Sequence, residues 1–100
     1  MREFDQTWTF SGTSGGGTAV EVTGDVVQSA WYVRVSTAST ATVTIQSALT
    51  STGPWYDELG TGALSTGASM VLRMAGPFAW VRPHNNSTAD TLTVRAIGVS

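Results

Sequence analysis

The sequence contains no cysteine, no lysine and a single histidine, His84. Without cysteine the chain forms no disulfide, so its stability must come from an ordinary packed core. Charged residues make up 12% of the chain, about half of the usual share of ~25%. The polar surface must therefore consist mainly of Thr, Ser, Asn and Gln. This composition favours a protein packed against neighbours over a free monomer.

The chain also lacks excess positive charge and long apolar segments. Its formal net charge is −2, whereas a nucleic-acid-binding protein needs a clustered basic surface. The five arginines are spread along the sequence, one in each of five segments. No apolar run approaches the ~18 residues of a transmembrane helix, and the N-terminus has no apolar region of a secretory signal. We expect no nucleic-acid or membrane partner, and synthesis in the cytoplasm.

The dominant pattern that is present is an alternation of Thr or Ser with apolar residues, which is typical of β-strands with one buried face. Turn-forming residues separate eight such segments. The segments are residues 6–10, 18–23, 30–36, 40–47, 55–59, 70–74, 78–82 and 91–97. Short strands at this spacing predict an all-β fold, an antiparallel β-sandwich or jelly roll of about seven or eight short strands.

The alternation also predicts the core and the organisation of the chain. The predicted core residues are Trp31, Val33, Val35, Val43, Ile45, Val71, Val81, Leu92 and Val94. Several glycines in residues 12–17 predict a flexible hinge, so residues 1–17 are interpreted as an N-terminal strand or arm and residues 18–100 as the β-sandwich domain. Such an arm is free to add to an exposed sheet edge of another protein. Its deletion is then expected to abolish binding without unfolding the domain.

Residues suited to catalysis or to ligand binding are scarce. His84 lies in a Pro-His-Asn-Asn turn, and no Gly-x-Ser-x-Gly nucleophile motif is present. Asp57 and Glu58 are adjacent, so on a strand they point to opposite faces and cannot share a metal ion. The glycine-rich segment lacks the lysine of a phosphate-binding loop. We therefore expect no enzymatic activity, no cofactor and no metal.

Four tryptophans in 100 residues are the strongest remaining signal. Buried tryptophans anchor cores, whereas exposed ones bind sugars or protein partners. We expect two of them in the core and Trp55, together with Tyr56, at a loop or subunit contact. Arg82, two residues after Trp80, suits a stacked pair with a carboxylate partner. The candidate interface residues are Phe4, Trp8, Phe10, Trp55, Tyr56, Trp80 and Arg82.

Three motifs carry a family resemblance. They are Trp-Tyr-Asp-Glu-Leu-Gly at residues 55–60, Gly-Pro-Phe-Ala-Trp-Val-Arg-Pro at residues 76–83 and Thr-Leu-Thr-Val-Arg-Ala at residues 91–96. With them the chain, roughly from residue 30 to residue 98, resembles the small β-sandwich proteins and modules of tailed-bacteriophage virions. The Asp-Gly turn usual before the tryptophan in that family is replaced here by Thr52-Gly53-Pro54.

The resemblance implies a structural role on a virion. Such proteins serve as capsid decoration or cement proteins, head fibres, or tail and baseplate parts, frequently as trimers, and no catalytic residues carry over. The expected function is that of a homotrimeric capsid decoration protein that binds the major capsid protein or another virion protein and stabilises the shell through many copies. The alternative is a carbohydrate-binding or tail- or baseplate-associated module that recognises host-surface glycans. A small hydrolase comes third.

Overall fold

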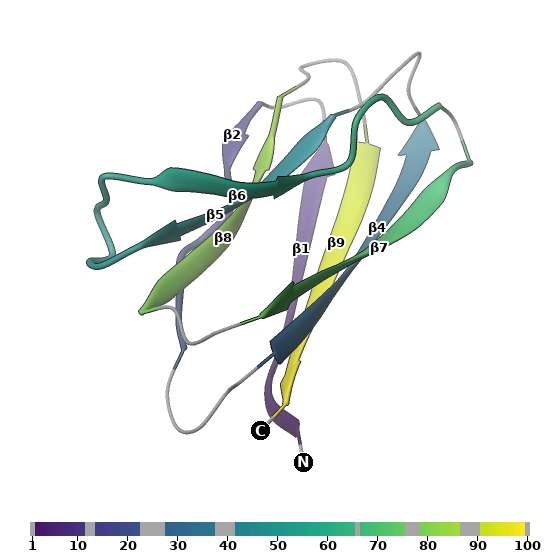
Figure 1. Cartoon of the computed structure of the whole chain (residues 1–100). Helices are drawn as coiled ribbons and strands as arrows, with labels where there is room; N and C mark the ends of the chain where they lie inside the picture. Colours follow the sequence, from purple (N-terminus) through teal and green to yellow (C-terminus); the bar gives the residue numbers. More distant parts are fainter. Residues whose placement is uncertain are drawn as a thin grey trace.

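The computed structural model describes residues 2–11, 14–22, 28–37, 42–65, 67–75, 79–86 and 91–99. Within these ranges the chain forms nine β-strands and no helix (Figure 1). The strands are β1 (Arg2–Ser11), β2 (Gly15–Gly16), β3 (Val20–Glu21), β4 (Gln28–Thr37), β5 (Val43–Ala48), β6 (Tyr56–Gly60), β7 (Ser69–Ala75), β8 (Trp80–Asn85) and β9 (Thr91–Val99).

The strands form two antiparallel sheets. One has four strands in the order β1-β9-β4-β7, and the other has the order β2-β8-β5-β6, with β3 also paired to β8. The predicted antiparallel β-sandwich is confirmed, and each of the eight predicted strand segments overlaps an observed strand. The two-residue strand β2 was not predicted, because two glycines carry no apolar alternation.

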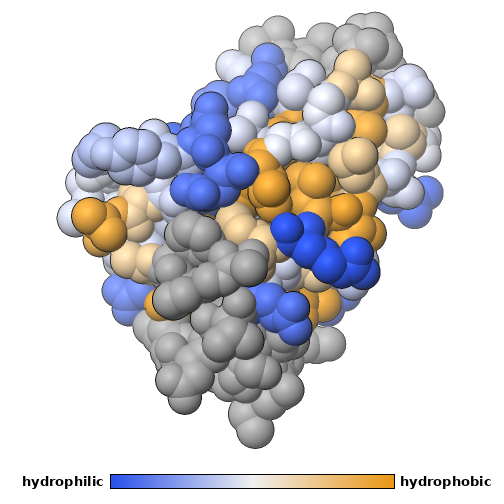
Figure 2. Space-filling model, viewed as in Figure 1, coloured by the Kyte–Doolittle hydropathy of each residue, from blue (hydrophilic) through white to orange (hydrophobic). Residues whose placement is uncertain are grey.

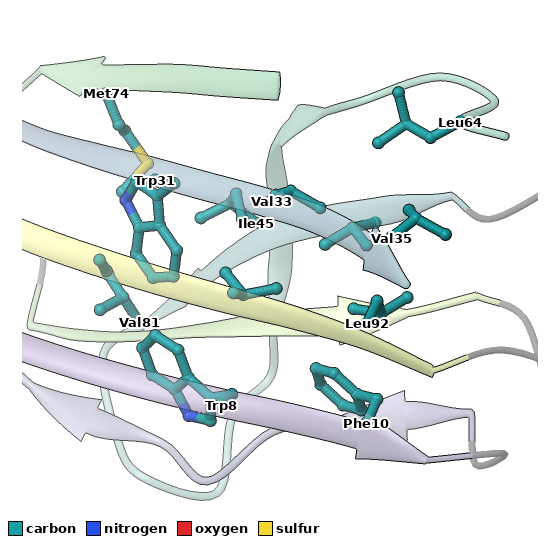
Figure 3. Packing of buried hydrophobic residues seen from close by; sticks show 13 residues of the cluster. Trp8, Phe10, Trp31, Val33, Val35, Ile45, Leu64, Met74, Val81 and Leu92 are labelled. Carbon is teal, nitrogen blue, oxygen red and sulfur yellow. The ribbon is translucent and has the colours of Figure 1, made fainter. Parts of the chain in front are cut away.

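The core lies between the two sheets (Figure 3). Within it the Trp8 and Trp31 rings stack with their centroids 5.4 Å apart and an interplanar angle of 10°. The buried hydrophobic cluster contains Trp8, Phe10, Trp31, Val33, Val35, Val43, Ile45, Leu64, Met74, Val81, Leu92, Val94 and Ala96. One predicted core residue is wrong: Val71 is 41% exposed. On β7 the next residue, Leu72, packs against the core instead, so Val71 points outward.

The prediction of a free N-terminal arm is wrong. β1 pairs with β9 from Arg2, opposite Val99, to Ser11, opposite Thr91. Its two aromatic side chains, Trp8 and Phe10, are each only 6% exposed. The glycines were interpreted as a hinge, but the alternating aromatic residues can only be buried if β1 belongs to the sandwich.

The glycine-rich segment after β1 connects the two sheets. Gly15 and Gly16 of β2 pair with β8, in the opposite sheet from β1. The Trp8 Nε1 atom donates a hydrogen bond of 2.8 Å to the backbone oxygen of Thr18. A Cβ atom at Gly17 would lie 2.6 Å from Trp8 Cδ1, so glycine allows the backbone to approach the indole ring closely. Residues 14–22 are thereby fixed to both sheets.

β8 is an inner strand of the second sheet, flanked by β5 on one side and by β2 and β3 on the other. Val81, Pro83 and Asn85 are buried, whereas Trp80, Arg82 and His84 are half-buried on the other face. The sequence predicted that Trp80 and Arg82 share a face opposite Val81, and the structure confirms this. The outer face of this sheet therefore presents an aromatic ring, a guanidinium and an imidazole in a row.

Candidate functional site

The outer face of the second sheet holds an arginine stacked on a tryptophan. The Cζ atom of Arg82 lies 4.2 Å from the ring centroid of Trp55. Trp55 directly precedes β6, whereas Arg82 lies on β8, with β5 between the two strands. This is a cation–π contact, and burial lowers the pKa of Arg82 from its usual value. Arg82 thus stacks on Trp55, and Trp80 lies beside it on the same strand.

A row of hydrogen bonds holds this arginine across three strands. Arg82 Nε donates a bond of 2.8 Å to Gln46 Oε1. Gln46 Nε2 in turn donates a bond of 2.9 Å to Asp57 Oδ1. The row follows the strand register, in which Gln46 lies opposite both Arg82 and Asp57. Gln46 could not be found from the sequence, because its role depends on the pairing of strands far apart in the chain.

Two glycines make room for this pair. At Gly16 an added Cβ atom would collide with the guanidinium of Arg82. At Gly53, which has a φ of 93°, an added Cβ atom would lie 2.8 Å from Trp55 Cδ1. Only glycine combines that backbone conformation with the close approach. The absence of a side chain at Gly16 thus leaves room for the guanidinium of Arg82, and its absence at Gly53 leaves room for the indole of Trp55.

His84 lies in a second polar row on the same face. Its Nδ1 atom is 2.7 Å from Asn86 Oδ1, and Asn86 Nδ2 donates a bond of 2.9 Å to Thr44 Oγ1. This contact orients the imidazole ring through its Nδ1 atom. In the ranges that the structure covers, no group of three His, Cys, Asp or Glu side chains is close enough to hold a metal ion.

The adjacent carboxylates on β6 bind side chains on opposite faces of β5. Asp57 accepts the bond from Gln46 on the outer face, and Glu58 Oε2 accepts a bond of 2.7 Å from the hydroxyl of Ser47. Ser47 is buried, whereas Gln46 is half-buried. The prediction that Asp57 and Glu58 point to opposite faces is confirmed.

The seven candidate interface residues do not form one surface. Trp55, Trp80 and Arg82 share the outer face of the second sheet, and Tyr56 is 59% exposed at the start of β6. Trp8 and Phe10, proposed as interface residues of an arm, belong to the core instead. For Phe4 the structure describes only the backbone, which pairs with Gly98 of β9, so its predicted interface role lies outside the described side chains.

Sequence reasoning missed a second surface on the outer face of the four-stranded sheet. There Tyr32 is 45% exposed, and it lies between Val71 of β7 and Arg95 of β9 in the strand register. Arg34 and Arg73 project from the same face. These arginines are far apart in the sequence, but the register places them on one face of three neighbouring strands, Arg34 opposite Ser69, Arg73 opposite Ala30 and Arg95 opposite Tyr32. Beside Tyr32 lies a hollow of about 250 Å³, lined by Gln28, Ser29, Ala30, Tyr32, Arg73 and Ile97.

One arginine of this surface is neutralised within the chain. Arg95 donates two hydrogen bonds to Asp5, of 2.9 Å from Nε and 2.6 Å from Nη2. Both the hydrogen bonds and the attraction to Asp5 raise the pKa of Arg95 above its usual value. Because the pair is exposed, it links β1 to β9 but should contribute little to the stability of the fold.

In the part of the chain that the structure describes, no helix is long and apolar enough to cross a membrane. No protein-family model and no curated protein matches the sequence. Solved structures do match. PirA superposes with a TM-score of 0.58 and 17% identity, over 95% of this chain and 93% of that chain.

The SPBc2 prophage-derived protein YomS superposes with a TM-score of 0.59 and 17% identity, over 97% of this chain and 96% of that chain. A chain of the disulfide-linked pili of Bacillus endospore appendages has a TM-score of 0.49 and 18% identity, over 97% of this chain and 85% of that chain. That last similarity is too low to support an argument. The likeness to PirA and YomS shows that this chain shares their fold along nearly its whole length.

Proposed function

We propose that this chain is a structural protein of a bacteriophage particle, and specifically a capsid decoration protein that binds the outer shell. The observation that carries the proposal is the shared fold with a prophage-derived protein, over 97% of this chain and 96% of that one. The motifs at residues 55–60, 76–83 and 91–96 resemble those of phage virion proteins and favour the same role.

The surfaces of the sandwich support a role in protein contacts. Arginine and aromatic residues are enriched in protein–protein interfaces, and both outer faces carry them, as Trp55 with Arg82 and as Tyr32 with Arg73. We propose that the chain acts as a homotrimer that binds the major capsid protein, without cofactor, nucleic acid or membrane. It is made in the host cytoplasm and acts on the virion, where many copies add up weak contacts.

A second candidate function is glycan binding, as a module of a phage tail or baseplate. It is favoured by the half-buried ring of Trp55, which lies next to the hydrogen-bonding side chains of Gln46 and Asp57. However, Arg82 already occupies a face of that ring. A sugar that stacks there has to displace the guanidinium, which places this function second.

Binding to particles tests the main proposal. Phage particles that have assembled without this chain, from a strain in which its gene is deleted, are incubated with the purified protein and sedimented. We expect saturable co-sedimentation and shells that resist higher temperatures. Protein that stays in the supernatant at all concentrations contradicts the proposal. A tryptophan emission shift with a glycan panel, lost in Trp55→Ala, would instead support the second function.

A further inference from the structure

The sandwich is open on the side between β6 and β7. Among the described strands, β6 pairs only with β5, and β7 pairs only with β4, so both are edge strands of their sheets. Figure 2 views this side and shows a hydrophobic area over β7 and between β7 and β6, with hydrophilic atoms on either flank. We call the area between these strands the open side.

The open side exposes apolar side chains from both sheets. Met70 of β7, in the alternating set that points toward the second sheet, is 38% exposed, and Val71, on the outer face of this edge strand, is 41% exposed beside it. Leu72 of β7 and Leu59 of β6 are half-buried and pack against the edge of the core. An apolar area of this kind on an otherwise polar surface marks an interaction site.

β7 also lacks the features that protect edge strands from pairing. Its sequence, Ser-Met-Val-Leu-Arg-Met-Ala, has no proline, a single charge and apolar residues on both faces. The edge strand β6 is shorter than β7 and carries two charges. The edge strand β1 is partly covered, because the backbone of Thr18 accepts a hydrogen bond from its Trp8 side chain. β7 is therefore the edge that most needs a partner to cover it.

The charges at the two flanks of the open side have opposite signs. β7 contributes Arg73, and β6 contributes Asp57 and Glu58. In the described ranges the ion pair formed within the chain is that of Arg95 with Asp5, which leaves Arg73 and Glu58 without an ionic partner. The open side thus has an apolar centre, a basic flank and an acidic flank.

We propose that a further copy of this chain covers the open side, with Arg73 of one copy facing Glu58 of the next. Because the flanks carry opposite charges, copies related by rotation bring unlike charges together and the apolar centres into contact. A closed ring of such contacts leaves no open side exposed. The inference rests on the self-association in the proposed function and names its interface, but it does not depend on a location on the virion.

Charge exchange tests the contact. The association constant of the purified full-length chain is measured by sedimentation equilibrium for the wild type, Arg73→Glu, Glu58→Arg and the double variant. We expect each single variant to weaken association by about tenfold or more, because like charges then face each other. The double variant, which restores unlike charges, should recover association to within about threefold of the wild type.

Arg34→Glu is the matched control. It makes the same charge change on β4, one strand away from the edge, and should leave association unchanged within about threefold. Far-UV circular dichroism of each variant verifies the fold. A monomer at every concentration, or an oligomer that Arg73→Glu does not weaken, overturns the inference. A monomer that still binds particles overturns this inference and the proposed homotrimer but leaves the decoration role standing. A charge-dependent oligomer that binds no particles overturns the decoration role and leaves this inference standing.

Discussion

Replacing Trp8 by alanine should reduce the free energy of unfolding by about 3–5 kcal/mol. A buried tryptophan removes about 150–250 Å² from water, which at ~25 cal/mol per Å² amounts to about 4–6 kcal/mol. The ring is 6% exposed, stacks on Trp31 and donates a hydrogen bond to the Thr18 backbone oxygen. Because domains of this size are stable by about 5–15 kcal/mol, the variant should lose much of its stability.

Urea denaturation followed by far-UV circular dichroism measures this change without relying on the tryptophan that is removed. Tyr56→Ala is the control, since Tyr56 is 59% exposed and its loss should change the free energy of unfolding by no more than about 0.5 kcal/mol. If Trp8→Ala costs less than about 1 kcal/mol, the reasoning is refuted, and β1 behaves as an arm outside the domain. By the same reasoning, deletion of residues 1–12 should unfold the domain.

Three further substitutions test individual contacts. Gly17→Ala should lower the free energy of unfolding by about 1–3 kcal/mol, because the new Cβ atom would lie 2.6 Å from Cδ1 of the Trp8 indole, which is held by its stacking on Trp31 and its bond to Thr18; an unchanged midpoint of urea denaturation contradicts this. Thr61→Val should lower the free energy of unfolding by about 1–3 kcal/mol, because Thr61 is 7% exposed and its hydroxyl accepts a 3.1 Å hydrogen bond from the backbone amide of Val43. An unchanged free energy of unfolding would show that this amide finds another acceptor. Gly16→Ala should displace the guanidinium of Arg82 from Trp55, so its tryptophan emission should change in the same direction as that of Arg82→Ala; a spectrum identical to the wild type contradicts the packing.

The strands could be predicted from the sequence because the chain alternates clearly where one face is buried. On β4, Trp31, Val33 and Val35 point into the core and the residues between them point outward, as the pattern predicts. On β7 the pattern fails, because apolar residues occupy both sets of alternating positions. There the charged Arg73 indicates the outward set, which includes Val71.

The position of β1 and the composition of the site could not be predicted, because both depend on pairing between distant residues. β1 pairs with β9 at the other end of the chain, and nothing within residues 1–17 specifies that partner. The contact of Arg82 with Trp55 and Gln46 likewise depends on the register of β5, β6 and β8. Composition indicated that these residue types matter, but only the sheet order shows which of them meet.

The most direct test of the central claim is the copy number of this chain in purified phage particles. Quantitative peptide mass spectrometry of particles released by the source strain gives its ratio to the major capsid protein. A structural protein that decorates the shell should be present in numbers comparable to the capsid protein. Its absence from the particles, or its presence only in traces, contradicts the account.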